Sequence, residues 1–261
     1  MVNSNSRPAE VIWNYDRVEL IADGIIHAIG VSLGLAGAIA IVVVAANSLH
    51  TAEISSIVVY SVGLLSMLGF SAAYNTWPVS RAKWVLRRFD HSAIFVMIAG
   101  TYTPFIAQMR SDLVAMGFLI GVWLTAVVGI ILKLLLPGRF DRLAVVLYLL
   151  LGWSGAVAYE PVAAALPSLS IWLLAVGGAL YSMGVVFHAW RSLRFQNVIW
   201  HAFVLVAACC HYSAVLFVWR MGGLEPKNVS FSDQQQGNQI LRFAAIDRER
   251  GSDLFIAGRL V

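Results

Sequence analysis

The sequence predicts an all-α polytopic membrane protein, a bundle of seven transmembrane helices, and three observations support this. Of its 261 residues, 59% are hydrophobic and only 12% are charged, whereas soluble domains hold roughly 45–50% apolar and about 25% charged residues. The apolar residues gather in seven runs, most of them near the roughly 20 residues that a helix needs to cross the hydrocarbon. The charged residues gather in the short connections. Helices are favoured because each spanning segment must satisfy its own backbone hydrogen bonds.

The chain divides into three parts by composition. Residues 1–18 are polar and lack the apolar core of a signal peptide, so the first apolar run is expected to serve as the targeting signal. Residues 19–220 form the membrane domain. Its spans are expected at about 24–46, 56–77, 91–109, 113–133, 143–159, 169–188 and 198–219. Residues 221–261 are again polar and charged, and they are predicted to form a flexible extramembrane tail.

Lysine and arginine residues are distributed unequally between the two sides of the predicted bundle. The amino-terminal segment and the loops after spans two, four and six hold eleven, whereas the opposite short loops hold one, Arg110. Positive residues mark cytoplasmic loops, so the amino terminus is expected inside and the carboxyl terminus outside. Bilayer orientation therefore accounts for the net charge of +4 without a nucleic-acid partner. We expect a multi-pass protein of the inner (plasma) membrane.

Polar and ionisable residues gather at the span ends that this orientation places on the cytoplasmic side. They are Glu19, Asp23, His27, Ser71, Asn75, Asp90, His188, Asn197 and His201. Several of them are four residues apart and so share one face of a helix. Ionisable residues within membrane spans usually face the bundle interior and mark a site. The pattern predicts a shared polar cavity that binds a membrane lipid or small ligand.

Other kinds of site find little support in the sequence. The two cysteines, Cys209 and Cys210, are adjacent and provide neither a disulfide framework nor a CxxC metal pair. No Walker loop, GxGxxG or GxSxG motif is present, so nothing favours nucleotide-driven transport or serine hydrolysis. Gly30-x3-Gly34 and Gly117-x3-Gly121 are small-residue faces, which suit packing within the bundle or contacts in a homo-oligomer.

Four stretches of the chain form a recognisable pattern: Glu19-x3-Asp23-x3-His27, Ser71-x3-Asn75, DHSAIFVMIAGTYTPF from Asp90 to Phe105, and NVIWHAFVLVAACCHYSAV from Asn197 to Val215. Together they resemble the hemolysin III family, the bacterial branch of the progestin and adiponectin receptor superfamily. The resemblance covers about residues 18–219. In better-understood members of the superfamily, one second-span histidine and two seventh-span histidines bind zinc, and the aspartate holds a zinc-bound water. The resemblance thus implies a hydrolase of an amide-linked lipid, since zinc lowers the pKa of its bound water.

The sequence departs from the family pattern at the zinc ligands. Asn75 and Asn197 stand at two histidine positions, Asp23 stands at an asparagine position, and only His201 remains of the three expected ligands. An amide oxygen is a poor substitute for imidazole at zinc. One hypothesis is therefore a degenerate zinc site in a protein that binds a lipid or small ligand, or senses membrane state. In it, Asn75 hydrogen-bonds to Asn197, and Asp90 pairs with an arginine, Arg87 or Arg88, or with His201.

Two further functions stay open. The first is a metal-dependent lipid amide hydrolase with Asp90 as the base, Ser71 as a second catalytic candidate and His201 as a metal ligand. Its ligands would be rearranged among Asp23, His27, Asp90 and His201, with His188 or His91 in reserve. The second takes the family name literally as a cytolysin. It is the least favoured, because a protein with seven packed spans has no soluble form that could insert into a membrane.

Overall fold

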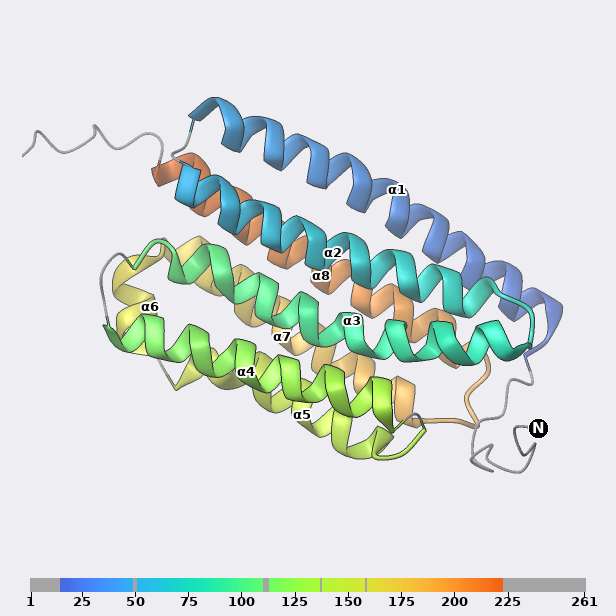
Figure 1. Ribbon diagram of the computed structural model, residues 1–261. Coiled ribbons are helices and arrows are strands. Elements are labelled where there is room, and N and C mark those ends of the chain that lie inside the picture. Colours follow the sequence, from blue (N-terminus) through green and yellow to red (C-terminus); the bar gives the residue numbers. More distant parts are fainter. Residues whose placement is uncertain (1–14, 49–50, 110–112, 137, 158, 223–261) are drawn as a thin grey trace, which may run out of the picture. The chain divides into compact units, whose positions relative to one another are not determined.

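The computed structural model describes residues 15–48, 51–109, 113–136, 138–157 and 159–222, and its regular secondary structure there is entirely helical (Figure 1). This confirms the all-α class. The helices are α1 (Arg17–Ser48), α2 (Thr51–Thr76), α3 (Arg81–Ile106), α4 (Leu113–Leu135), α5 (Asp141–Trp153), the 3-10 helix η1 (Ser154–Ala156), α6 (Tyr159–Ala165), α7 (Ser168–Ala189) and α8 (Gln196–Gly222). The predicted tail lies outside the described residues from 223 onward, and the predicted amino-terminal segment lies outside them up to residue 14.

The seven predicted spans fall on α1, α2, α3, α4, α5, α7 and α8. Several helices extend beyond the predicted bounds, α1 for example from Arg17 rather than from residue 24, and the largest differences are in α3 and α5. Helix α3 begins at Arg81 rather than at residue 91, because the basic segment before the apolar run is itself helical. The Ser80 hydroxyl caps this segment by accepting a hydrogen bond from the Lys83 N–H at 3.3 Å. The predicted fifth span, 143–159, is wrong in length, since α5 ends at Trp153 and a separate short helix, α6, begins at Tyr159.

Among the helices that the structure describes, five are long and apolar enough to cross a membrane, namely α1, α2, α4, α7 and α8. Helix α3 carries five charged residues in its first three turns, and α5 has only 13 residues. On α4, the apolar side chains of Ile120, Leu124 and Val128 are 56%, 62% and 56% exposed. A row of apolar side chains pointing outward would be costly in water, whereas it suits a helix that contacts lipid. The described helices therefore form a multi-pass membrane protein.

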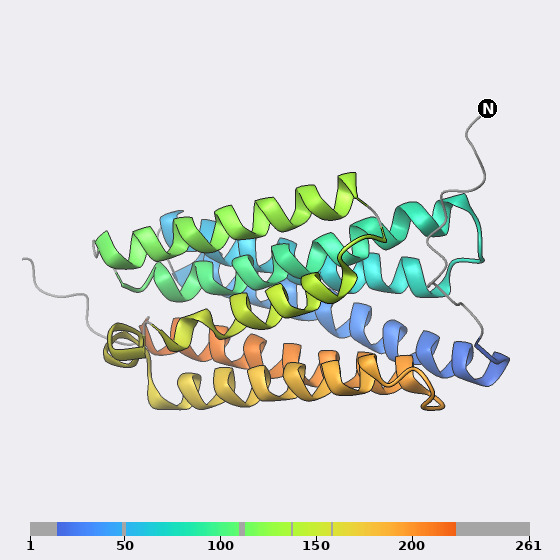
Figure 2. The same cartoon turned by 90° about the horizontal axis from the view of Figure 1, so that it is seen from below.

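Helix α3 packs against both α2 and α4, and Figure 2 shows these helices running side by side. The α2–α3 contact depends on two glycines. A Cβ at Gly63 would lie 3.2 Å from the Val96 carbonyl oxygen, and one at Gly100 would lie 3.3 Å from the Val59 carbonyl oxygen. The opposite face of α3 contributes Phe95, 1% exposed, to an apolar cluster with α4 and α5. Small residues thus bring α3 close enough to its neighbours to hold its polar first turns in place.

The first and last described helices are neighbours. The Tyr212 hydroxyl of α8 donates a hydrogen bond to the Gly37 carbonyl of α1 at 2.9 Å. At the other end of α1, Asp16 and Glu19 form a capping box: the Glu19 N–H donates to Asp16 Oδ1 at 2.8 Å, and the Asp16 N–H donates to Glu19 Oε2 at 3.0 Å. The second Glu19 oxygen, Oε1, accepts from the Phe195 N–H at 2.8 Å. Glu19 thereby ties the start of α1 to the turn before α8.

Candidate functional site

A cavity of about 890 Å³ lies among the helices. Its charged and other polar lining residues at one end come from the starts of α1, α3, α5 and α8, the ends of α2, α4 and α7, and the segments beside them, and these helix ends lie together at the right of Figure 1. Apolar residues predominate farther along, among them Met97, Phe105 and Leu174. All nine predicted polar residues, from Glu19 to His201, are part of the lining. The cavity therefore has a charged end and a mainly apolar remainder.

Asp23, His27 and His201 form a buried cluster at the charged end. Asp23 Oδ1 lies 2.6 Å from His201 Nδ1, and Asp23 Oδ2 lies 3.5 Å from His27 Nε2. The two imidazole ring centroids are 4.4 Å apart. The three residues are 5%, 6% and 8% exposed in that order, and one potential ligand atom from each lies within 4.8 Å of the others. The spacing of four between Asp23 and His27 places both on the face of α1 that meets α8.

His27 Nε2 is a buried polar atom that makes no hydrogen bond to any described residue. Its contact with Asp23 Oδ2, at 3.5 Å, is an ion-pair distance only. Leaving a buried donor or acceptor unsatisfied costs roughly 1–3 kcal/mol. Such an atom, aimed at a carboxylate and a second imidazole, indicates a position that could receive a ligand.

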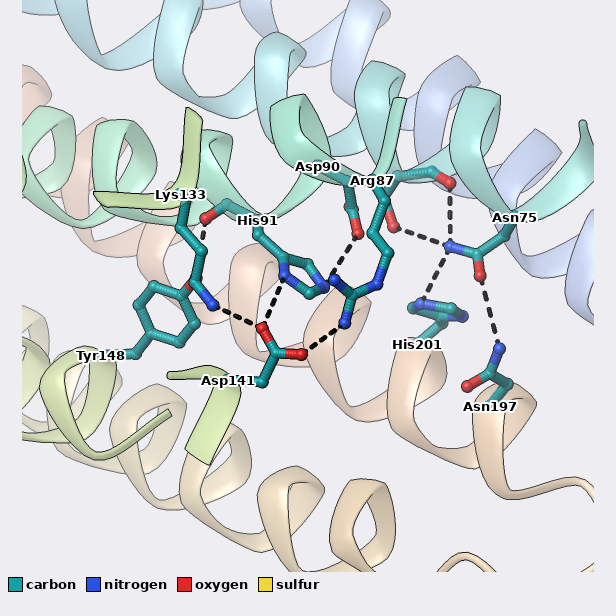
Figure 3. A network of polar contacts seen from close by, with 10 residues as sticks. Asn75, Arg87, Asp90, His91, Lys133, Asp141, Tyr148, Asn197 and His201 are labelled. Atoms are coloured by element: carbon teal, nitrogen blue, oxygen red, sulfur yellow. Dashed lines mark hydrogen bonds and ion pairs between the residues drawn. The ribbon is translucent and has the colours of Figure 1, made fainter. Parts of the chain in front are cut away.

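Asn75 and Asn197 lie on the other side of the His201 ring. Asn75 Nδ2 is 3.5 Å from His201 Nε2, and Asn197 Nδ2 donates to Asn75 Oδ1 at 3.4 Å, as Figure 3 shows. Asn75 Nδ2 also donates to the Ser71 carbonyl at 2.9 Å. The hydrogen bond between the two asparagines, expected from the sequence, is therefore present. Positions 75, 197 and 201, at which the resemblance implies histidine, are thus adjacent in space, although two of them hold amides.

Asp90 lies beside Ser71 and His91. The Ser71 side chain is a hydrogen-bond partner of its carboxylate, and His91 Nε2 lies 4.0 Å from Asp90 Oδ2. The expected pairing with Arg87 is wrong, because the Arg87 guanidinium donates to Asp141 Oδ2 at 2.7 Å instead. Arg88 also points elsewhere, donating to the Leu134 carbonyl at 3.4 Å.

Two predicted residues lie at the edge of the site and not in its centre. Both carboxylate oxygens of Glu19 accept hydrogen bonds from backbone N–H groups, those of Asp16 and Phe195. The His188 ring packs against Trp200, with centroids 5.0 Å apart, and the His188 carbonyl accepts from Gln196 Nε2 at 2.6 Å. His188 therefore lines the cavity, and both of these contacts are with residues of α8 rather than with Asp23 or Asp90.

A second polar cluster, centred on Asp141, was missed by the sequence analysis. Its carboxylate accepts from Lys133 Nζ at 2.6 Å and from Arg87 at 2.7 Å, and His91 Nδ1 lies 3.9 Å away (Figure 3). The Tyr148 hydroxyl adds a hydrogen bond to the His91 carbonyl at 2.7 Å. Lys133 was interpreted only as a cytoplasmic loop charge, and Arg87 as a loop charge or a partner of Asp90. Their burial, 4% and 8% exposed, carries no simple sequence signal, because their partner lies in the first turn of another helix, α5.

The fold and the site define a class: a multi-pass α-helical membrane protein with a buried cluster of acidic, imidazole and amide groups at one end of its bundle. Comparison with known proteins identifies the family. The family profile described as "Haemolysin-III related" matches residues 19–212. The chain is 36% identical over 199 residues to "Hemolysin-3 homolog" of Bacillus subtilis (strain 168), covering 76% of this chain and 93% of the relative. It is 33% identical over 199 residues to "Hemolysin-3" of Bacillus cereus, covering 76% and 91%.

The chain therefore belongs to the hemolysin III family, within the progestin and adiponectin receptor superfamily. A more distant relative is human "Monocyte to macrophage differentiation factor", 29% identical over 163 residues, covering 60% of this chain and 67% of the relative. No solved structure matches.

The residues present do not fit the zinc ligand set that the family resemblance implies. Positions 75, 197 and 201 converge, but around His201 Nε2 they offer one imidazole and two neutral amides. Zinc sites in proteins are built from three or four strong donors, chiefly imidazole, thiolate and carboxylate. Zinc held in the family's manner therefore has too few strong ligands in this chain.

Proposed function

We propose that the protein binds one amphiphilic lipid, with its headgroup at the charged end of the cavity and its acyl chain in the mainly apolar remainder. The observation that carries this proposal is the cavity itself. Its volume of about 890 Å³ lies within the ~300–1,000 Å³ typical of ligand sites. Hydrogen-bonding groups at Asn75, Asp90 and His201 suit a headgroup with both donors and acceptors, and the Met97 and Phe105 side chains suit a hydrocarbon chain.

The proposed orientation places this headgroup end at the cytoplasmic face of the inner membrane, with α3 and α5 completing a seven-span bundle. Fusing green fluorescent protein or alkaline phosphatase after Val261 tests it. We expect phosphatase activity and no fluorescence at that end, because seven spans and a cytoplasmic amino terminus leave the carboxyl end outside. A fusion at Met1 should give fluorescence. A fluorescent carboxyl-terminal fusion would contradict the combination of seven spans with a cytoplasmic amino terminus, and the fusion at Met1 would then show which of the two is wrong.

Blocking the cavity should abolish lipid binding. Val204 on α8 lines the cavity, whereas Val206, two residues on, is 52% exposed on the outside of the helix. We expect Val204→Trp to weaken binding of palmitate and N-palmitoylsphingosine at least tenfold, because the indole would occupy the space of the acyl chain. Val206→Trp, the matched control, should bind as wild type does. Native mass spectrometry and probe-dependent thermal stabilisation of the detergent-purified chain measure both. Equal lipid binding by the wild type, Val204→Trp and Val206→Trp would contradict the proposal that the lipid occupies this cavity.

Metal-dependent hydrolysis of an amide-linked lipid is the second candidate, and the grouping of Asp23, His27 and His201 favours it. The same purified protein decides between the two, since release of palmitate from N-palmitoylsphingosine would indicate turnover. Here Asp90, with its Ser71 partner, is the base candidate. Leakage from dye-loaded liposomes would instead support a cytolysin.

A further inference from the structure

The two sides of the His201 ring differ in the ligands that they offer to a cation. On the Nε2 side, the nearest group is the Asn75 amide, followed by Asn197. On the Nδ1 side lie the Asp23 carboxylate at 2.6 Å and the His27 ring, with its centroid 4.4 Å from that of His201. All the strong donors near His201 among these residues therefore lie on the Nδ1 side.

We propose that this chain binds a divalent transition-metal ion through Asp23, His27 and His201, on the opposite side of His201 from the family's zinc position. The three ligand atoms already lie within 4.8 Å of one another. Two imidazoles and one carboxylate form a ligand set that holds zinc in some hydrolases and iron(II) in non-haem oxygenases. This proposal does not depend on lipid binding.

The unsatisfied His27 nitrogen supports a ligand at this position independently of the distances. His27 Nε2 is buried and makes no hydrogen bond to a described residue, although it faces the Asp23 carboxylate at 3.5 Å. A neutral imidazole nitrogen is a metal ligand by chemistry, and two ligands four residues apart on one helix present their donors to a single ion. His201 on α8, the helix that faces α1 here, provides the third ligand.

The substitutions relative to the family pattern weaken the ligands on one side of the His201 ring and add a ligand on the other. Relative to the family pattern, the chain lacks an imidazole at both 75 and 197 on the Nε2 side, and it has a carboxylate in place of an amide at 23 on the Nδ1 side. An added negative charge within a membrane bundle is costly unless it is paired. A divalent cation between Asp23 and the two histidines would pair it, and this gives the Asp23 substitution a physical reason.

Metal content tests the proposal on the full chain, purified in detergent through a tag without histidine after growth with zinc, iron, manganese and cobalt. We expect about one transition-metal ion per chain by elemental analysis. Asp23→Asn and His27→Ala should each lower that content at least tenfold. His188→Ala, which removes a cavity histidine outside the set, and the double variant Asn75→Ala/Asn197→Ala should both retain the ion. Loss of metal in the asparagine double variant, with retention in His27→Ala, would overturn the displaced site.

X-ray absorption of the wild-type chain is a test that requires no variant to fold. Two imidazoles and at least one oxygen ligand are expected in the first coordination sphere of the bound ion. A single imidazole, or the absence of any bound metal after reconstitution with zinc or iron(II), would overturn the proposal. If the metal proposal is overturned, the lipid-binding proposal still stands, because its Val204→Trp test needs no metal.

Discussion

Replacing Asp141 by asparagine should destabilise the protein more than any other single exchange of similar size in the cavity wall. The substitution leaves Lys133 and Arg87, whose side chains are only 5% and 10% exposed, without their shared carboxylate. Removing one partner of a fully buried ion pair costs ~3–5 kcal/mol. Since the Asp141 side chain is 33% exposed, we expect about 2–4 kcal/mol, at the lower end of that range. Thermal unfolding in detergent, followed by circular dichroism, measures the loss.

A second change in the same cluster distinguishes the charge effect from a general loss of packing. Adding Lys133→Met to Asp141→Asn should restore part of the stability, because one of the two uncompensated charges is then gone. Arg194→Gln provides the control, since it breaks an exposed ion pair with Asp16, at 68% and 48% side-chain exposure, and such pairs contribute little. If Asp141→Asn unfolded at the same temperature as Arg194→Gln, the buried cluster would have no structural role.

Restoring the family's histidines should create a zinc site on the Nε2 side of His201. In the double variant Asn75→His/Asn197→His, three imidazoles would converge, because Asn75 already lies 3.5 Å from His201 Nε2 and 3.4 Å from Asn197. Three imidazoles with an open fourth position form a strong zinc site. In the His27→Ala background, which removes the displaced site, we expect about one zinc per chain by elemental analysis, with affinity at least tenfold above that of either single histidine variant in the same background.

The His27→Ala background separates this restored site from the displaced one. There the triple variant Asn75→His/Asn197→His/His27→Ala should retain zinc, whereas His27→Ala alone should not. A triple variant that remains monodisperse and folded yet takes up no zinc would show that positions 75, 197 and 201 do not converge on one point.

The sequence predicted the helices well, and it erred where charge occurs within a helix. Seven apolar runs located α1 to α5, α7 and α8, because length and composition suffice when a segment must cross lipid. The start of α3 was placed too late, since a basic segment such as that containing Arg87 looks like a loop until its partner is known. That partner, Asp141, lies in the first turn of α5, 54 residues away in the chain, and periodicity within one helix cannot reveal it.

The candidate site was predictable in membership but not in arrangement. The spacing of four placed Asp23 and His27 on one face of α1, and the orientation of the spans placed His201 at the same end of the bundle. Which side of the His201 ring would meet α1 depends on the rotation of α8 about its axis. That rotation follows from contacts such as Tyr212 with Gly37, which join distant parts of the chain. The sequence therefore predicted a shared cavity but not its two chemically different sides.

The adjacency of α1 and α8 has a consequence for how the protein is made. Asp23 enters the membrane with α1, whereas His201, 2.6 Å away in the finished structure, belongs to the last of the described helices. The Asp23 carboxylate therefore has no partner from α8 while the helices between them are synthesised. Among the described helices, the contact between α1 and α8 can form only after all the others have been made.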